Sequence, residues 1–200
     1  TASNPAPRGI IERTVRKGIE KKATTMIMFT GACTYSPETR VAMRALTEAF
    51  QIRLDESLRE KLGGTYSPGT GGSCSRRPHA EYGITVRFES SDANVESLSK
   101  AVFGIIDSLK TQGPSEADVV KVREQIIRSR EVDLKENIYW LNSIIARDQT
   151  GEALAGITTG YDALVKQITS ATIKEAAKKY LDTRNYMKFV LLPQATPPTP

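Results

Sequence analysis

The sequence VAMRALTEAFQIRLDESLREKLGGTYSP, residues 41–68, contains the strongest structural pattern in the chain. Its apolar residues recur about every four positions, the spacing that lines one face of an α-helix. They are Ala42, Leu46, Phe50, Leu54, Leu58 and Leu62, with Val41, Ala45 and Ala49 beside them. Ser36 followed by Pro37 is typical of a helix start, and Gly63 or Gly64 of a helix end. The pattern predicts one long helix over residues 37–62.

Shorter segments on both sides of this helix have the composition of β-strands. Residues 10–16 and 24–30 are rich in β-branched and apolar side chains, and the turn region around Gly18 predicts that they pair as a hairpin or meander. After the helix, residues 65–74 are glycine-rich but strand-like, and residues 82–89 alternate between apolar and polar side chains. A closing strand is predicted at residues 186–192.

The region between these last two strands is predicted to be helical. The expected helical regions are residues 95–109, 115–149 with a break near Asn137, 161–168 and 170–181. Ser115, with Asp118 three residues on, resembles a capping box. This order predicts an α+β fold with a largely antiparallel sheet covered on one face by helices. We expect one domain over residues 9–193, with residues 1–8 and the proline-rich residues 194–200 as tails or linkers.

Composition narrows the class of protein without indicating a function. The chain has 200 residues, of which 39% are hydrophobic and 26% charged, as in an ordinary globular domain. The net charge of +5 is spread over amphipathic segments, so it is weak evidence for a nucleic acid or membrane partner. The longest apolar runs are too short to span a bilayer. The first residue is threonine and the end is proline-rich, which favours a piece excised from a longer protein.

Reactive residues are few. Cys33 and Cys74 can be free or form one bridge, and we expect them to be free, because two cysteines do not imply a disulfide framework or a cysteine metal site. His79 is the single histidine, which excludes the two-histidine zinc motifs H-E-x-x-H and H-x-x-E-H. The chain therefore has no self-contained zinc hydrolase motif, and we expect no metal in it.

Arg59 and Tyr66 lie seven positions apart, on either side of the glycine pair. The simplest interpretation makes Arg59 a surface arginine that pairs with Asp55 one helical turn back, and Tyr66 a half-buried strand tyrosine. Both residues nevertheless lie at one corner between a helix and a strand. A guanidinium and a phenol placed there can face a common cleft.

The order of several longer stretches resembles a known family. LDESLREKLGGTYSP, GPSEADVVKVREQ, ENIYWLNSI and a final strand closing on LLP resemble a C-terminal-half domain of the pitrilysin, or insulinase-like, zinc peptidases, over residues 13–193. In that family two homologous halves enclose a substrate chamber; one half carries zinc on H-x-x-E-H with a further glutamate, and the other carries an arginine and a tyrosine. The resemblance implies that this chain is the non-zinc half.

The resemblance also implies roles for the pair. The phenol of Tyr66 would donate a hydrogen bond to the peptide carbonyl oxygen as it gains negative charge during attack by a zinc-bound water. The guanidinium of Arg59 would hold a carbonyl or carboxylate of the substrate, a peptide or protein. The zinc would belong to a homologous partner domain or subunit. The fragment alone is expected to be inactive.

Two other classes of function compete with this interpretation. A non-catalytic scaffold or assembly subunit of the same fold would tolerate Tyr66→Phe, and the presence of both Arg59 and Tyr66 favours the peptidase half. A nucleic acid binder that uses Arg76 and Arg77 ranks last, because the sequence has no stripe of aromatic and basic residues. Similarity to large bacterial members of the family favours the bacterial periplasm or envelope.

Overall fold

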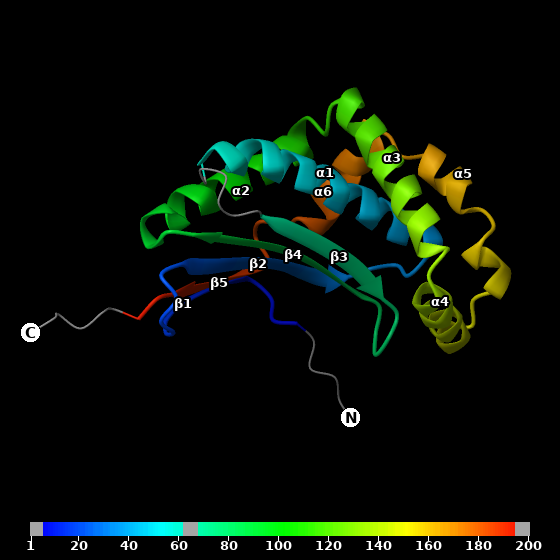
Figure 1. Cartoon of the computed structure of the whole chain (residues 1–200), viewed down its shortest axis with the longest axis horizontal. Helices are drawn as coiled ribbons and strands as arrows, with labels where there is room; N and C mark the ends of the chain where they lie inside the picture. The colour runs from blue at the N-terminus through cyan, green and yellow to red at the C-terminus, as the bar shows by residue number, and fades with distance from the viewer. Residues whose placement is uncertain (1–5, 62–67, 195–200) are drawn as a thin grey trace, which may run out of the picture.

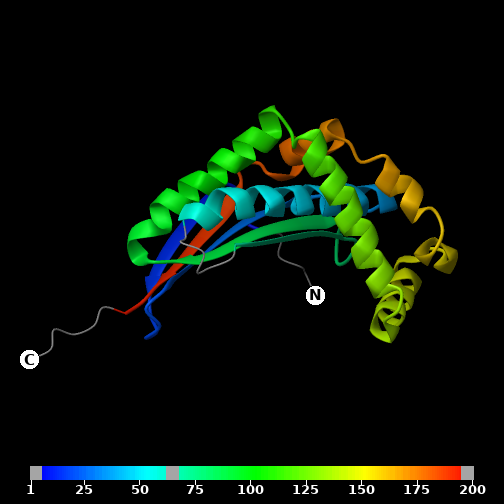
Figure 2. The same ribbon diagram turned by 45° about the horizontal axis from the view of Figure 1, so that its top comes forward.

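The chain forms a five-stranded sheet with helices packed on one of its faces (Figures 1 and 2). This computed structural model describes residues 6–61 and 68–194. The strands are β1 (Ile10–Arg16), β2 (Ala23–Ala32), β3 (Gly69–Ser75), β4 (Glu81–Ser90) and β5 (Tyr186–Leu192). The predicted α+β fold, with a sheet covered on one face, is confirmed.

The strand order is β1-β5-β2-β4-β3. β5 pairs with β1 in parallel and with β2 in antiparallel orientation, and the remaining pairs are antiparallel. The predicted pairing of the first two strands is therefore wrong, because β5 lies between them. Asn185 contributes to this placement: its Oδ1 accepts from the Gly9 amide at 2.7 Å and its Nδ2 donates to the Thr30 carbonyl at 2.9 Å. One side chain thus joins both neighbours of β5.

The helices follow the predicted pattern closely. They are α1 (Pro37–Lys61), α2 (Val95–Thr111), α3 (Glu116–Asp133), α4 (Asn137–Thr150), α5 (Tyr161–Lys166) and α6 (Ser170–Tyr180), with short 3-10 turns η1 (Asp92–Asn94) and η2 (Leu154–Ile157). The expected break near Asn137 separates α3 from α4. Ser36 begins α1 by accepting from the Thr39 amide at 3.1 Å, and Ser115 begins α3 by accepting from the Asp118 amide at 3.1 Å.

Helix α1 is the central element of the core. Its residues Leu46, Phe50, Leu54 and Leu58 are completely buried. The helix contacts β3 on one side and α2, α3 and α6 on the others. Its length of 25 residues corresponds to about 37 Å at 1.5 Å per residue. α1 therefore connects two distant ends of the molecule, which are described separately below.

The opposite face of the sheet is not covered by the described helices (Figure 2). Along β2 the side chains alternate, so that Ile27 and Phe29 are buried under the helices while Met26 and Met28 are only partly buried. Met187 lies opposite Met28 and Phe189 opposite Met26 in the antiparallel register with β5. These side chains form the uncovered face of the sheet.

Candidate functional site

Arg59, the first residue of the predicted pair, lies on the last turn of α1. The side chain of Arg59 and all of Tyr66 lie outside the described residues. Their expected proximity and roles therefore stay predictions.

The described residues around this corner show how β3 is held against α1. The Gln51 side chain donates from Nε2 to the Pro68 carbonyl at 2.9 Å and accepts at Oε1 from the Thr70 amide at 2.9 Å. It also donates to Asp55 Oδ1 at 3.1 Å. Gln51 thus anchors the start of β3 to the middle of α1. Nothing in the sequence singled out this residue, because a glutamine on a helix has no recognisable motif.

A cavity of about 640 Å³ lies at the other end of α1. It is enclosed by the first two turns of α1, the end of β3, and residues of α3, α4, η2 and α5. Its lining includes the arginines Arg40, Arg44, Arg130 and Arg147, and the carboxylates Glu38 and Glu152. Tyrosine rings, apolar side chains, glycines and the hydroxyl residues Ser73, Ser143 and Thr159 complete the wall. The sequence analysis did not identify this site, because its residues come from segments far apart in the chain.

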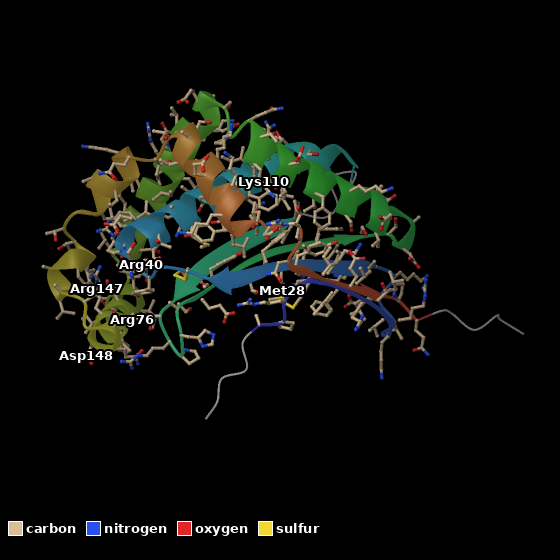
Figure 3. All side chains as sticks on the ribbon, turned by 180° about the vertical axis from the view of Figure 1, so that it is seen from behind. Met28, Arg40, Arg76, Lys110, Arg147 and Asp148 are labelled. Carbon is tan, nitrogen blue, oxygen red and sulfur yellow. A yellow bond between two sulfur atoms is a disulfide. The ribbon has the colours of Figure 1, made fainter. Side chains whose placement is uncertain are left out.

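Two of these arginines share one carboxylate. Arg40 donates to both oxygens of Glu152 at 2.8 Å, and Arg147 Nη1 lies 3.2 Å from Glu152 Oε2. Figure 3 shows Arg40 and Arg147 at the same end of the molecule. The hydrogen bonds from Arg40 are the largest cause that lowers the pKa of Glu152 below its ordinary value of 4.5. Glu152 is therefore ionised at neutral pH, and the trio of side chains has a net charge of +1.

Arg147 is also fixed by the backbone around it. Its Nη1 donates to the Ala153 carbonyl at 2.9 Å and its Nη2 to the Gly156 carbonyl at 2.6 Å. A Cβ added at Gly156 would lie 2.6 Å from Nη1 of Arg147, closer than non-bonded atoms pack. Gly156 therefore allows the guanidinium to approach the η2 backbone.

Arg130 is the most buried of the four arginines, with 9% of its surface exposed. Its Nη2 donates to the Ile157 carbonyl at 2.6 Å, and its guanidinium lies 4.1 Å from the centre of the Tyr161 ring. Burial raises the pKa of Tyr161, so its phenol is neutral. The carboxylate that pairs with Arg130 is Asp162, at 4.0 Å and with 77% of its side chain exposed. The charge of Arg130 is therefore only weakly compensated.

Cys33 and Cys74 form a disulfide bridge, and Cys74 lines the cavity. The expectation of free cysteines is wrong. The sheet register brings the two together: Ala32 at the end of β2 and Ser75 at the end of β3 both pair with Glu81 of β4. The residues next to them converge across the start of β4. The bridge joins segments separated by 41 residues.

Neither a metal cluster nor a membrane span occurs in the described part of the chain. Across residues 6–61 and 68–194, no group of three or more His, Cys, Asp and Glu side chains is placed to hold a metal ion. His79 lies with its Nε2 3.2 Å from Glu81 Oε2. Among these same residues, no helix has both the length and the apolar character needed to cross a bilayer.

Several solved structures share this fold. The ferredoxin protease FusC, solved in complex with Arabidopsis ferredoxin, superposes with a TM-score of 0.80 at 17% identity, over 98% of this chain and 21% of that one. The periplasmic protease PqqL from Escherichia coli gives 0.75 at 22% identity, over 93% of this chain and 21% of its own. A peptidase M16 inactive domain from Pseudomonas fluorescens gives 0.75 at 16% identity, over 98% and 47%. The chain thus spans less than half the length of each.

Sequence comparison identifies the family. No curated protein matches the chain. The family model described as the peptidase M16 inactive domain matches residues 2–126, which is more than half of the chain and includes α1 and β3. This match confirms the resemblance, and it covers two of the stretches that carried it, LDESLREKLGGTYSP and GPSEADVVKVREQ. The chain therefore belongs to the peptidase M16 inactive domain family.

Proposed function

We propose that this domain is the substrate-binding half of a zinc metallopeptidase, and that peptide hydrolysis requires a homologous domain or subunit that carries the zinc. The observation that carries this proposal is the family match over residues 2–126, a region that contains both Arg59 and Tyr66. A domain of this family without its own metal needs a zinc-bearing partner to take part in hydrolysis. On this proposal, only an assembly that contains both halves would hydrolyse peptides.

The proposed chemistry divides between the two halves. The partner's zinc would activate water, and Tyr66 would donate to the carbonyl oxygen where negative charge develops, so its contribution would be larger in the transition state than in the ground state. Arg59 would set the register of the peptide with its fork of donors. The completely buried Leu54 and Leu58 support this role, because they hold the last turns of α1 against the core.

The substrate is proposed to be an extended peptide or a protein. β3 supports this, because it is the last strand in the sheet order and begins at Gly69, three residues after Tyr66 in the sequence. A peptide would pair, as an added strand, with backbone groups of β3 beyond Thr70, whose amide already donates to Gln51. The structural relative FusC is a ferredoxin protease that was solved in complex with Arabidopsis ferredoxin, which supports a protein substrate.

The bacterial periplasm or envelope is the proposed compartment. The Cys33–Cys74 bridge supports it, because disulfides persist mainly outside the reducing cytosol. One of the structural relatives, PqqL, is a periplasmic protease. Thiol labelling of the protein directly after cell lysis under denaturing conditions would test this: both cysteines should be protected until a reductant is added. Immediate labelling of both would contradict it.

The decisive experiment is Tyr66→Phe in the parent assembly, with zinc content and folding matched to the wild type. Loss of one transition-state donor should lower peptide turnover about 100- to 1000-fold. Tyr186→Phe is the matched control, because it also removes one phenol hydroxyl. That hydroxyl donates to Glu12 at 2.7 Å, near the edge of the sheet opposite to β3. That variant should retain turnover.

Two results would redirect the assignment. Unchanged turnover in Tyr66→Phe would show that the phenol takes no part in the reaction. Absence of turnover in a wild-type assembly with zinc bound would favour the alternative, a scaffold or assembly subunit of the same fold. A loss of zinc from Tyr66→Phe would instead point to a structural role for the residue between the halves.

A further inference from the structure

We propose that the cavity at the N-terminal end of α1 is a binding site for a carboxylate attached to an apolar or aromatic group, as in an acidic peptide segment. The cavity is lined by Arg40, Arg44, Arg130 and Arg147 together with apolar and tyrosine side chains. Its volume of about 640 Å³ lies within the usual range of ligand sites, about 300 to 1000 Å³. Binding here requires no zinc-bearing partner, so this proposal is independent of the proposed catalytic role.

The cavity lies far along α1 from Arg59. Arg40 and Arg59 lie 19 residues apart on one helix, which corresponds to about 28 Å at 1.5 Å per residue. A ligand that fills the cavity therefore cannot reach Arg59. If one peptide occupied both places, it would need about eight or nine extended residues to join them.

The charge balance of the lining favours an anion. Glu152 is already shared by Arg40 and Arg147, and Glu38 is exposed at the rim. Arg44 pairs with Glu48 at 2.9 Å. Within residues 6–61 and 68–194, the carboxylate paired with Arg130 is the exposed Asp162 at 4.0 Å, and its other partners, Tyr139, Ile157 and the Tyr161 ring, are neutral. A buried cation without a close counterion is unfavourable, since its charge is removed from water without full compensation. A carboxylate in the cavity would supply the missing negative charge.

The wall favours a ligand with an apolar body. Val41, Met43, Ile157 and Leu164 line the cavity, and the Tyr161 ring lies under the Arg130 guanidinium. The four aliphatic and thioether side chains offer no hydrogen bonds, so they would add nothing to the binding of a compact, fully hydrated anion such as phosphate. They suit an aromatic or aliphatic group next to a carboxylate, with the guanidinium donors holding the charged end.

Contacts within the chain hold the walls of the site in place. Arg147 donates hydrogen bonds to the carbonyls of Ala153 and Gly156, and Arg130 donates to that of Ile157. The disulfide at Cys74 holds the β3 side of the wall. Fixed donors lower the entropy cost of binding, because few side chains need to be ordered when the ligand arrives. This preorganisation distinguishes the cavity from a surface group of arginines.

The four methionines of the chain provide a direct test. Met43 lines the cavity, whereas Met26, Met28 and Met187 belong to β2 and β5 and do not line it. The 200-residue chain labelled with 13C at the methionine methyl groups would be titrated with N-acetyl-Phe-Glu-Glu. We expect a saturable shift of the Met43 signal alone. N-acetyl-Phe-Gln-Gln-amide, which has the same shape without charge, should bind at least about tenfold more weakly.

Variants on α1 localise the effect. Arg44→Gln removes a cavity charge, and Arg53→Gln is its matched control, since Arg53 also pairs along α1, with Glu56 at 3.8 Å, but lies outside the cavity. We expect about tenfold weaker binding for Arg44→Gln and none of that loss for Arg53→Gln. Arg130→Lys keeps the charge but not the planar fork, and should also weaken binding. Melting temperatures would verify that all three variants fold.

Phenylacetate, a free carboxylate with an aromatic group, distinguishes the two sources of the carboxylate. Tighter binding of the peptide would identify an acidic peptide segment as the ligand, and equal or tighter binding of phenylacetate would identify a small aromatic acid; both support the site. Equal binding of the charged and neutral peptides would overturn it. So would wild-type affinity in Arg44→Gln, shifts of Met26, Met28 or Met187 in place of Met43, or the absence of saturable binding by either probe.

Discussion

The two ends of α1 are held in place by different kinds of interaction. At the N-terminal end, Ser36 caps the helix, Arg40 pairs with Glu152, and the Cys33–Cys74 bridge crosses the adjacent cavity wall. Toward the C-terminal end, Leu54 and Leu58 are completely buried among apolar side chains. Polar and covalent links depend on a few atoms in one geometry, whereas apolar burial depends on area and volume. The stability of the N-terminal end of α1 should therefore depend on single links and on pH and redox conditions. The stability of the C-terminal end should depend mainly on the volume of its buried side chains.

Removal of the bridge should have the largest effect. Cys33→Ser combined with Cys74→Ser should lower the free energy of unfolding by about 4 kcal/mol, because a bridge across 41 residues restricts the unfolded chain. Urea denaturation would measure this, and hydrogen exchange should show faster opening at the N-terminal end of α1 than at Leu54. Reduction of the wild type is the control and should have the same effect. An equal increase in hydrogen exchange at both ends of α1 would show that the bridge does not stabilise the N-terminal end in particular.

Loss of volume at the other end should cost slightly less. Leu58→Ala should lower the free energy of unfolding by about 3 kcal/mol, because it removes a fully buried side chain and leaves a cavity. Glu56→Ala is the control, since the Glu56 side chain on the same turn is 52% exposed. The cost of Leu58→Ala should not depend on reductant. A dependence on reductant would show that the two ends are coupled.

Glu152→Gln should cost about 2 kcal/mol at neutral pH, because Arg40 and Arg147 lose their shared carboxylate. The effect should depend on pH with a definite sign. The pKa of Glu152 is lowered in the folded protein, so its contribution is present above its ordinary pKa of 4.5 and is lost as the pH falls through the lowered value.

Denaturation of the wild type and Glu152→Gln over a range of pH would measure this. The difference between them should be constant near neutral pH and shrink below pH 4.5. Other carboxyls with lowered pKa values, such as Asp118 and Asp182, remain in both proteins and cancel in the difference. A gap that stays constant into the acid range would show that Glu152 acts by packing alone.

The helix cap should have the smallest effect. Ser36→Ala should cost about 1 kcal/mol, since the Thr39 amide loses its acceptor. Ser115→Ala removes the equivalent cap from α3 and should cost a similar amount. Hydrogen exchange distinguishes the two, because only Ser36→Ala should increase exchange in the first turn of α1. Equal exchange in both variants would show that the bridge and Arg40 already hold that turn.

Features that depend on neighbouring residues were predicted well. The helix predicted over residues 37–62 agrees with α1 up to Lys61, where the described segment ends, and β5 occupies residues 186–192 as expected. The break near Asn137 and the caps at Ser36 and Ser115 were also recognised. Each of these is recorded in the spacing of apolar residues or in one residue at an element boundary. The family resemblance likewise followed from stretches that are continuous in the sequence.

Features that join distant residues were missed. The pairing of β1 with β5 brings together Ile10 and Tyr186, and the Arg40–Glu152 pair spans 112 residues. A strand pattern shows which side chains are buried but not which strand lies beside it. The sequence around an arginine on a helix does not indicate which distant carboxylate it will pair with. The bridge was missed for the same reason, since the register at Glu81 that brings Cys33 and Cys74 together is a property of the sheet.

The sequence by itself determined the helices and strands, the face that each one buries, and membership of the family, because periodicity and contiguous motifs are local. Only the tertiary structure decided the strand order, the disulfide and the arginine-lined cavity at the start of α1. These depend on which distant segments pack together, and that choice is made by the free energy of the whole core. The roles of Arg59 and Tyr66 stay predictions from the sequence, whereas the cavity around Arg130 was found only in the tertiary structure.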